Sequence, residues 1–324
     1  MAVADVKLPQ MSEQNALFRN VLVAVDFSDP SRRALSVALA LARRFDSHLS
    51  AVHVLRTDWR YEVLESPPEL ELERIDAALK LRNWTDNLRS EIGESDLQID
   101  SILLKHGPAA RAIAALAEEQ KTDVLVLGTH GRGGLLKFAL GSVAEETLRI
   151  APCPVITIGP KCKVAPLCES ISFGTILLAT DFGPGSRKAL KITLALAATH
   201  KSRLILLHML LPMPATSANL TAFSPPIAAA DELEEWETSS RKRALRELKE
   251  CLPQDTGLAQ EPEFVVGTDF LPEGILISAE KFNVDLIVMG ANRTSAARAV
   301  AHLPWTAVNE ILASARCPVL TVAE

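Results

Sequence analysis

The sequence predicts an α/β protein made of two tandem, doubly wound domains, each with a parallel sheet flanked by helices. Three observations lead to this prediction. The chain has 324 residues, which corresponds to about two domains of ordinary size. Five sequence blocks occur twice, in the same order, in the two halves. Within each half, short β-branched runs alternate with helical stretches, the pattern of a parallel sheet covered on both faces.

The repeated blocks indicate that one domain has been duplicated. Three pairs share an offset of 155 residues, and the last two pairs have offsets of 162 and 164. An offset that grows along the chain is expected when loops gain residues while strands and helices are kept. The matching blocks are 21–27 with 176–182, 33–35 with 188–190, 49–54 with 204–209, 122–128 with 284–290, and 153–158 with 317–322.

The elements of the first half follow from periodicity. We expect strands over 20–26, 48–55, 98–104, 123–128 and 154–158. We expect helices over 31–45, 70–92, 109–119 and 142–150, with Pro30 and Pro108 where helices begin.

The same patterns place the domain boundaries. We expect a first domain over 19–158, a linker over 159–172 that contains two prolines, and a second domain over 173–324. The proline-punctuated segment 211–230 is expected to be a long loop, either a lid or an insertion.

Composition excludes several classes of protein. A net charge of −6 and a pI near 5.7 provide no basic field for a nucleic acid. The chain has no apolar run long enough to span a membrane and no leader pattern. Its five cysteines form no C-x-x-C pair, which argues against zinc and for a reducing compartment. We therefore expect a cytoplasmic protein without nucleic-acid or membrane partners.

The residues that point most clearly to a ligand site follow the fourth strand of the first half. Glycines at 128, 131, 133 and 134 allow backbone N–H groups to surround an anion, and Gly141-Ser142 opens a helix whose N-terminus suits a phosphate. A Walker A motif is absent, and the first strand ends in Asp26-Phe27-Ser28-Asp29-Pro30 without the glycines of a dinucleotide fold.

The spacing Gly128-x2-Gly131-x9-Gly141-Ser142 resembles the nucleotide-binding signature of the universal stress protein family, in its ATP-binding branch. The block 21–28 and the Cys-Pro-Val that begins at Cys153 resemble the same family. This resemblance covers nearly the whole chain as two copies. It implies a five-stranded parallel sheet of order 3-2-1-4-5, in which the ligand crevice lies between strands 1 and 4.

The resemblance also implies a set of ligand contacts. Asp26 and Val54 would contact the adenosine end of ATP. Ribose and phosphates would be cradled by Gly128, Gly131, Gly141, Ser142 and Val143, with Gly133 in the same loop and with His130 and Arg132 nearby on charge grounds. Mg²⁺ would be held through the phosphates. We expect no catalytic residue and no metal ligand from the protein.

Each of these residues also has a purely structural interpretation. The glycine loop could be a tight turn, and Ser142-x-x-Glu145 matches a capping box. Asp26 could hold the turn that follows it. His53 and His208 fall inside apolar strands, where a hydrogen-bonded core histidine is expected. Cys153 and Cys317 are expected to pack as small apolar residues.

The second half departs from the glycine pattern. Arg293 stands in place of Gly131, and Trp305-Thr306 in place of Gly141-Ser142, so a close approach of backbone to phosphate is blocked. We therefore expect ATP in the first domain only, in a regulatory protein of the stress-response type. The alternatives are a slow nucleotide hydrolase, at most a weak ATPase, and a nucleotide-free interaction module.

The fifth strands, 154–158 and 318–322, would each be an apolar sheet edge in the inferred order. Such an edge must be covered. We expect the two edges to face each other within one chain as a pseudo-twofold dimer, an arrangement that leaves room for a further homodimer.

Overall fold

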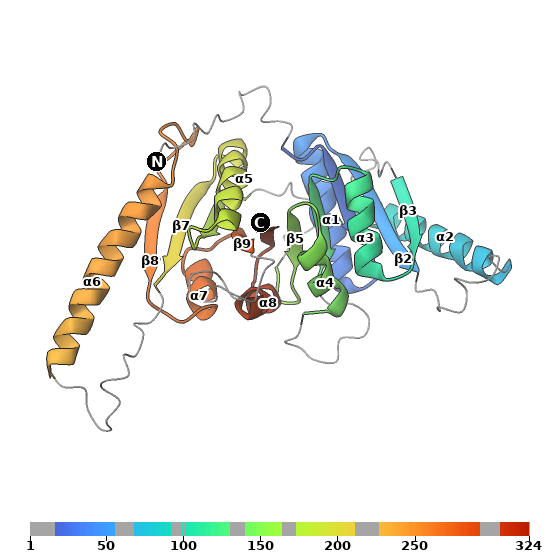
Figure 1. Ribbon diagram of the computed structural model, residues 1–324. Helices are drawn as coiled ribbons and strands as arrows, with labels where there is room; N and C mark the ends of the chain where they lie inside the picture. The colour runs from blue at the N-terminus through green and yellow to red at the C-terminus, as the bar shows by residue number, and fades with distance from the viewer. Residues whose placement is uncertain are drawn as a thin grey trace.

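A single continuous sheet runs through the molecule. The computed structural model describes residues 17–55, 68–91, 99, 101–129, 140–163, 173–210, 227–291 and 305–323. In this part of the chain ten strands form one sheet of order β3-β2-β1-β4-β5-β10-β9-β6-β7-β8, flanked by helices (Figure 1).

The first half contains β1 (Asn20–Ala24), α1 (Asp29–Phe45), β2 (His48–Leu55), α2 (Pro68–Glu91), β3 (Ser101–His106), α3 (Ala109–Glu119), β4 (Val124–Gly128), α4 (Ser142–Ile150) and β5 (Val155–Ile158). The second half contains β6 (Thr175–Ala179), α5 (Pro184–His200), β7 (Arg203–Met209), α6 (Ile227–Glu250), β8 (Glu263–Gly267), α7 (Glu273–Lys281), β9 (Leu286–Ala291), α8 (Trp305–Ser314) and β10 (Val319–Ala323).

Each half has the strand order 3-2-1-4-5, all parallel, so the predicted fold class is confirmed. Several boundaries differ from expectation. The third strand lies at Ser101–His106 rather than 98–104. The first helix begins at Asp29 rather than 31, because the Ser28 side chain caps it and Pro30 occupies its first turn. The expected loop 211–230 ends earlier, since α6 begins at Ile227.

The two halves meet through β5 and β10, which form the antiparallel pair of an otherwise parallel sheet. Ile156 faces Leu320 across this pair, and Thr157 faces Val319. The two edge strands that the sequence marks as needing cover thus lie side by side (Figure 1), and β3 and β8 become the outer edges of the sheet.

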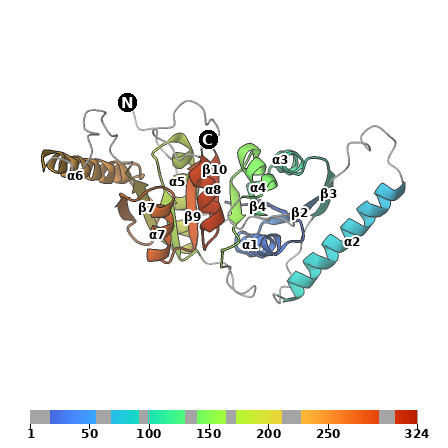
Figure 2. The ribbon, with the colours of Figure 1, turned by 90° about the horizontal axis from the view of Figure 1, so that it is seen from below.

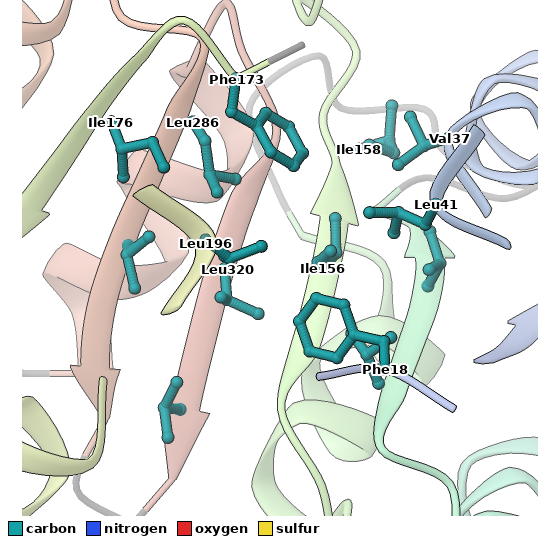
Figure 3. Close-up of a cluster of buried hydrophobic side chains, with 14 of the residues drawn as sticks. Phe18, Val37, Leu41, Ile156, Ile158, Phe173, Ile176, Leu196, Leu286 and Leu320 are labelled. Atoms are coloured by element: carbon teal, nitrogen blue, oxygen red, sulfur yellow. The ribbon is translucent and has the colours of Figure 1, made fainter. Parts of the chain in front are cut away.

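Two hydrophobic cores lie on opposite faces of the sheet, and each continues across the junction. The first packs α1, α2, α5 and α6 on the strands, and the second packs α3, α4, α7 and α8. Ile156, Ile158 and Leu320 belong to the first core, beside the rings of Phe18 and Phe173 (Figure 3). The two domains share one continuous sheet and both cores, so neither core ends at the junction.

Polar contacts also link the domains at the junction. Arg44 at the end of α1 donates from its Nη2 to the main-chain oxygen of Thr199 in α5, at 2.6 Å. The neighbouring ring of His200 packs against Phe45 and Phe173, with ring centroids 5.8 and 5.2 Å away. Of the expected linker 159–172, the structure describes 159–163, where the Lys163 N–H donates to the Arg316 oxygen at 2.8 Å.

Candidate functional site

The candidate site lies at the carboxyl edge of the first domain's sheet. There β1 is flanked by β2 on one side and β4 on the other. The strand order reverses at β1, which is where doubly wound sheets bind ligands. Asp26 follows the end of β1, and Thr129 follows the end of β4.

The turn after β1 is held by the Asp26 carboxylate. Its Oδ1 accepts hydrogen bonds from the Ser28 N–H at 3.0 Å and from the Ser28 hydroxyl at 2.5 Å. Phe27 between them has a φ of 65°, the left-handed region, which a side chain adopts only when its surroundings enforce it. Asp26 therefore has the structural role that the sequence allowed for it. A contact of this residue with ligand stays a prediction.

Two serines that sequence reasoning passed over organise this turn. The Ser28 Oγ accepts from the Ser31 N–H at 3.3 Å, which caps α1. The Ser31 Oγ in turn accepts from the Asp26 N–H at 3.4 Å. The signal in the sequence is a serine three residues before another at a helix start, an ordinary capping pattern.

Gly128 is needed for packing at the end of β4. A Cβ at this position would lie 2.8 Å from the carbonyl carbon of Pro30 and 2.9 Å from the nitrogen of Ser31. Real Cβ atoms do not approach backbone that closely, so any side chain would push β4 away from the first turn of α1. Its counterpart Gly290 is held still more tightly, 2.3 Å from the nitrogen of Ser186.

The start of α4 is anchored beside the end of β4. The Gly141 N–H donates to the oxygen of Thr129 at 2.7 Å, and the Thr129 N–H donates to the oxygen of Ile158 at 3.1 Å. Together with the packing of Gly128, these bonds bring Asp26, the end of β4 and the first turn of α4 to one edge of the sheet.

The N-terminus of α4 differs from expectation. The predicted capping box starting at Ser142 is wrong: Gly141 is the N-cap, with φ −64° and ψ 141°, and no side chain caps the helix. Ser142 is instead the first helical residue and is exposed. Glu145 accepts from Arg149 at 3.0 Å. Within the described residues, the first N–H groups of α4 thus have neither an intrahelical nor an N-cap side-chain acceptor, the arrangement that binds anions.

Val54 and His53 lie near the end of β2, on opposite faces. Val54 is half-buried against the core that contains α3 and α4. His53 Nδ1 lies 2.7 Å from the oxygen of Val25, and its ring packs 4.7 Å from the ring of Phe27. His208 makes the equivalent contact with the oxygen of Thr180 at 2.8 Å. Both histidines are therefore hydrogen-bonded parts of the scaffold, as predicted.

Of the ten residues that the sequence proposed, the structure places six at this edge. The remaining four, His130, Gly131, Arg132 and Gly133, lie outside the described residues. The six that the structure places are Asp26, Val54, Gly128, Gly141, Ser142 and Val143. Val143 exposes 44 % of its surface, in the uncapped first turn of α4.

The second domain keeps the turn and loses the helix start. Asp181 Oδ1 accepts from the Gly183 N–H at 2.8 Å and from the Ser186 hydroxyl at 2.5 Å. Phe182 repeats the left-handed conformation, with φ 61°. However, α8 begins at Trp305, the counterpart of Gly141. Arg293, the counterpart of Gly131, lies outside the described residues. The aspartate turn and its packing glycine therefore persist where the glycine loop does not.

The cysteine thiols, which could in principle react, have structural roles. Cys317 is buried, and this burial raises the pKa of its thiol to about 12. Cys153 is half-buried and packs against the second core, as expected of a small apolar residue. Within the described ranges, no group of three or more His, Cys, Asp or Glu side chains could hold a metal ion. None of the helices described there is long and apolar enough to cross a membrane.

Comparisons with known proteins agree with the fold. The model of the universal stress protein family matches residues 17–159 and 172–323. A universal stress protein of Methanocaldococcus jannaschii is 31 % identical over 144 residues, which is 44 % of this chain and 82 % of the relative. One from Thermus aquaticus is 33 % identical over 144 residues, 44 % of this chain and 99 % of the relative.

Two solved structures resemble nearly the whole chain. A universal stress protein of Archaeoglobus fulgidus has a TM-score of 0.59 at 17 % identity, covering 95 % of this chain and 97 % of its own. A functionally unknown protein of Pseudomonas aeruginosa has a TM-score of 0.56 at 17 % identity, with 95 % and 94 % covered. These likenesses concern the fold. The two family-model matches show that this chain belongs to the universal stress protein family, with two copies of the family's domain in tandem.

Proposed function

We propose that the first domain binds ATP at the edge formed by the ends of β1 and β4, and that the protein acts as a nucleotide-dependent regulator in stress responses. The observation that supports this most is the uncapped N-terminus of α4, with Gly141 as its N-cap. Free N–H groups and the helix dipole favour an anion there. The sequence supplies the glycines of a phosphate loop immediately before it.

The other ligand contacts follow from the same edge. Gly128, Thr129 and Gly141 hold the ends of the glycine loop beside the Asp26 turn. A phosphate chain at α4 would leave the adenosine to lie over the ends of β1 and β2, near Asp26 and Val54. His130 and Arg132 would add positive charge to the loop, and Mg²⁺ would be bound through the phosphates. The sequence offers no activated nucleophile or general base at the loop, so binding rather than turnover is the proposed activity.

The second domain is proposed not to bind ATP. Its helix begins with Trp305 where the first domain has Gly141. A side chain at that position takes the space that the phosphates would need.

Calorimetry with Mg·ATP on the full chain tests this proposal. We expect about one site per chain, and at least a ~10-fold loss of affinity in Gly131→Val and Gly141→Val. The loss at Gly141 is steric, because its φ of −64° is open to any residue. Thr306→Val, at the counterpart of Ser142, is the matched control and should bind as the unsubstituted chain does.

Two results would contradict the proposal. One is a stoichiometry of two. The other is unchanged affinity in Gly131→Val and Gly141→Val variants whose circular dichroism shows that they are folded. Mass spectrometry of nucleotide released from the purified protein identifies the ligand independently of the titration.

A further inference from the structure

The outward face of α2 carries an apolar stripe. Leu72, Ile75 and Leu79 are 67 %, 50 % and 56 % exposed. Their spacing places all three within an arc of about 60° on the helix. The opposite face holds α2 on the domain through the buried residues Ala77, Leu81 and Leu88. The stripe therefore takes no part in the packing that keeps α2 in place.

The duplicated domain provides the equivalent helix face for comparison. In the second half α6 has the position of α2, covering β7 and β8. Both helices have 24 residues. The side chains of α6 are described from Glu234 onwards, and the exposed residues between there and Lys242 are polar: Glu234, Glu235, Thr238, Ser239 and Lys242. Three large apolar side chains at the matching surface of α2 are thus a difference between two copies of one scaffold, and they mark a contact surface.

We propose that this stripe binds the same stripe of a second copy of the chain, with the two α2 helices antiparallel about a twofold axis. In this arrangement Leu72 of one copy faces Leu79 of the other, and Ile75 lies next to the axis. A twofold contact needs a patch that complements itself. Leu72 and Leu79 lie three and four residues on either side of Ile75, so antiparallel pairing about a point next to Ile75 brings Leu72 of each copy to Leu79 of the other.

Charge along α2 favours the antiparallel direction. The sequence is acidic before the stripe, at Glu69 and Glu71, and basic after it, at Lys80 and Arg82. Antiparallel pairing brings the acidic stretch of each copy to the basic stretch of the other, whereas parallel pairing would bring like charges together.

The position of α2 permits this contact. α2 stands at one end of the molecule, far from the β5–β10 junction, and its length projects beyond the sheet (Figure 2). Three apolar side chains per copy are fewer than a standard interface of ~800 Å² per partner contains. The dimer is therefore reversible, with a dissociation constant in the low micromolar range or higher.

Analytical ultracentrifugation of the full chain, from about 1 µM to about 1 mM, tests the proposal. We expect dimer to appear as concentration rises. The Leu72→Glu/Leu79→Glu variant should associate at least ~10-fold more weakly. The matched control is Thr238→Glu/Ser239→Glu on α6, which should associate as the unsubstituted chain does. All substituted positions are exposed, so unfolding temperatures should stay alike.

Cysteine cross-linking tests the direction of pairing. With copper-phenanthroline as oxidant, Ile75→Cys should form a covalent dimer, above the background of the unsubstituted chain with its five cysteines. Leu72→Cys alone should not cross-link, but a mixture of Leu72→Cys and Leu79→Cys should. Efficient cross-linking of Leu72→Cys with itself would mean parallel helices and overturn the arrangement.

Other outcomes overturn the self-association itself. A chain that stays monomeric over the whole concentration range refutes it, as does a dimer that Leu72→Glu/Leu79→Glu leaves unchanged. Specific capture of another protein by the stripe of a monomeric chain would assign the surface to a different partner. These measurements need no nucleotide, so their outcome does not depend on whether the first domain binds ATP.

Discussion

Thr157 in β5 donates its hydroxyl hydrogen to the main-chain oxygen of Val319 in β10, at 3.2 Å, directly across the strand pair that joins the two domains. Its counterpart in the second half is Thr321, which faces Val155. The hydroxyl of Thr321 is buried and has no hydrogen-bond partner among the described residues. The pseudo-twofold junction is therefore asymmetric in its polar contacts.

This asymmetry predicts that replacing threonine with valine has different effects on stability at the two positions. Thr157→Val should lower the free energy of unfolding by about 1 kcal/mol, since it removes a buried hydrogen bond. Thr321→Val should be neutral or slightly stabilising, because it replaces an unpaired buried hydroxyl with a methyl group of the same shape. Urea unfolding of both variants measures the difference. Equal losses would show that the Thr157 bond contributes nothing particular to the junction.

A charge inside the junction should disrupt it. Ile156 has no exposed surface and faces Leu320. Ile156→Lys places an ammonium group in the shared core, at a cost of several kcal/mol. We expect aggregation or a large drop in melting temperature by circular dichroism. Ile150→Lys is the control, because Ile150 is 39 % exposed and should lose less than ~0.5 kcal/mol. A soluble Ile156→Lys variant with unchanged melting would argue that the strands do not pair in solution.

Gly128 and Gly290 should behave alike in stability. Each Cβ would meet backbone at under 3 Å, so Gly128→Ala and Gly290→Ala should each cost about 1–3 kcal/mol. Gly174→Ala is the control, since its Cβ would meet a carboxylate oxygen of Asp285 at 3.3 Å, and a side chain can move. Denaturant unfolding without nucleotide measures all three. Should Gly128→Ala reduce ATP affinity with no loss of stability, its role would be in binding rather than packing.

His200 makes stability depend on pH. Burial, followed by the nearby positive charge of Arg44, lowers the pKa of His200 from 6.5 to about 4 in the folded protein. The folded state therefore resists a proton that the unfolded chain accepts. Stability should be unaffected by this residue above pH 6.5, decline as the pH falls from 6.5 towards 4, and level off below that.

His200→Phe isolates this effect from the titration of other groups. The phenyl ring keeps the packing on Phe45 and Phe173 and removes a buried nitrogen that lacks a partner among the described residues. The difference in unfolding free energy between His200→Phe and the unsubstituted chain should grow in favour of the variant as the pH drops from 6.5 to 4. A difference that stays constant with pH would rule out the titration of His200 as its source.

Sequence reasoning failed where the answer depended on a neighbour distant in the chain. The spacing Ser142-x-x-Glu145 satisfies a capping box locally. In the structure the bond from Gly141 to the Thr129 oxygen sets where α4 begins, so Gly141 becomes the cap. Gly128 also has a packing role that the sequence did not reveal, because its closest neighbours are Pro30 and Ser31 of another element; its contact with a ligand stays a prediction. The third strand, β3, begins and ends later than predicted for the same reason: its bounds are set by pairing with β2, and register is a property of a pair of strands.

By itself, the sequence determined the duplication and the loss of the glycine loop in the second half, because a repeat compared with itself exposes such features directly. The strand order within each half came from the resemblance to the universal stress protein family, and the structure confirms it. The sequence also predicted that the edges of β5 and β10 would face each other, and the tertiary structure decided their antiparallel register within one continuous sheet. Only the tertiary structure decided that the Asp26 turn and the packing of Gly128 recur in the second domain, and that α2 leaves an apolar stripe outward. The reason is that a residue's burial and hydrogen-bond partners depend on which surfaces meet. Those surfaces come from segments that can lie more than a hundred residues apart in the chain.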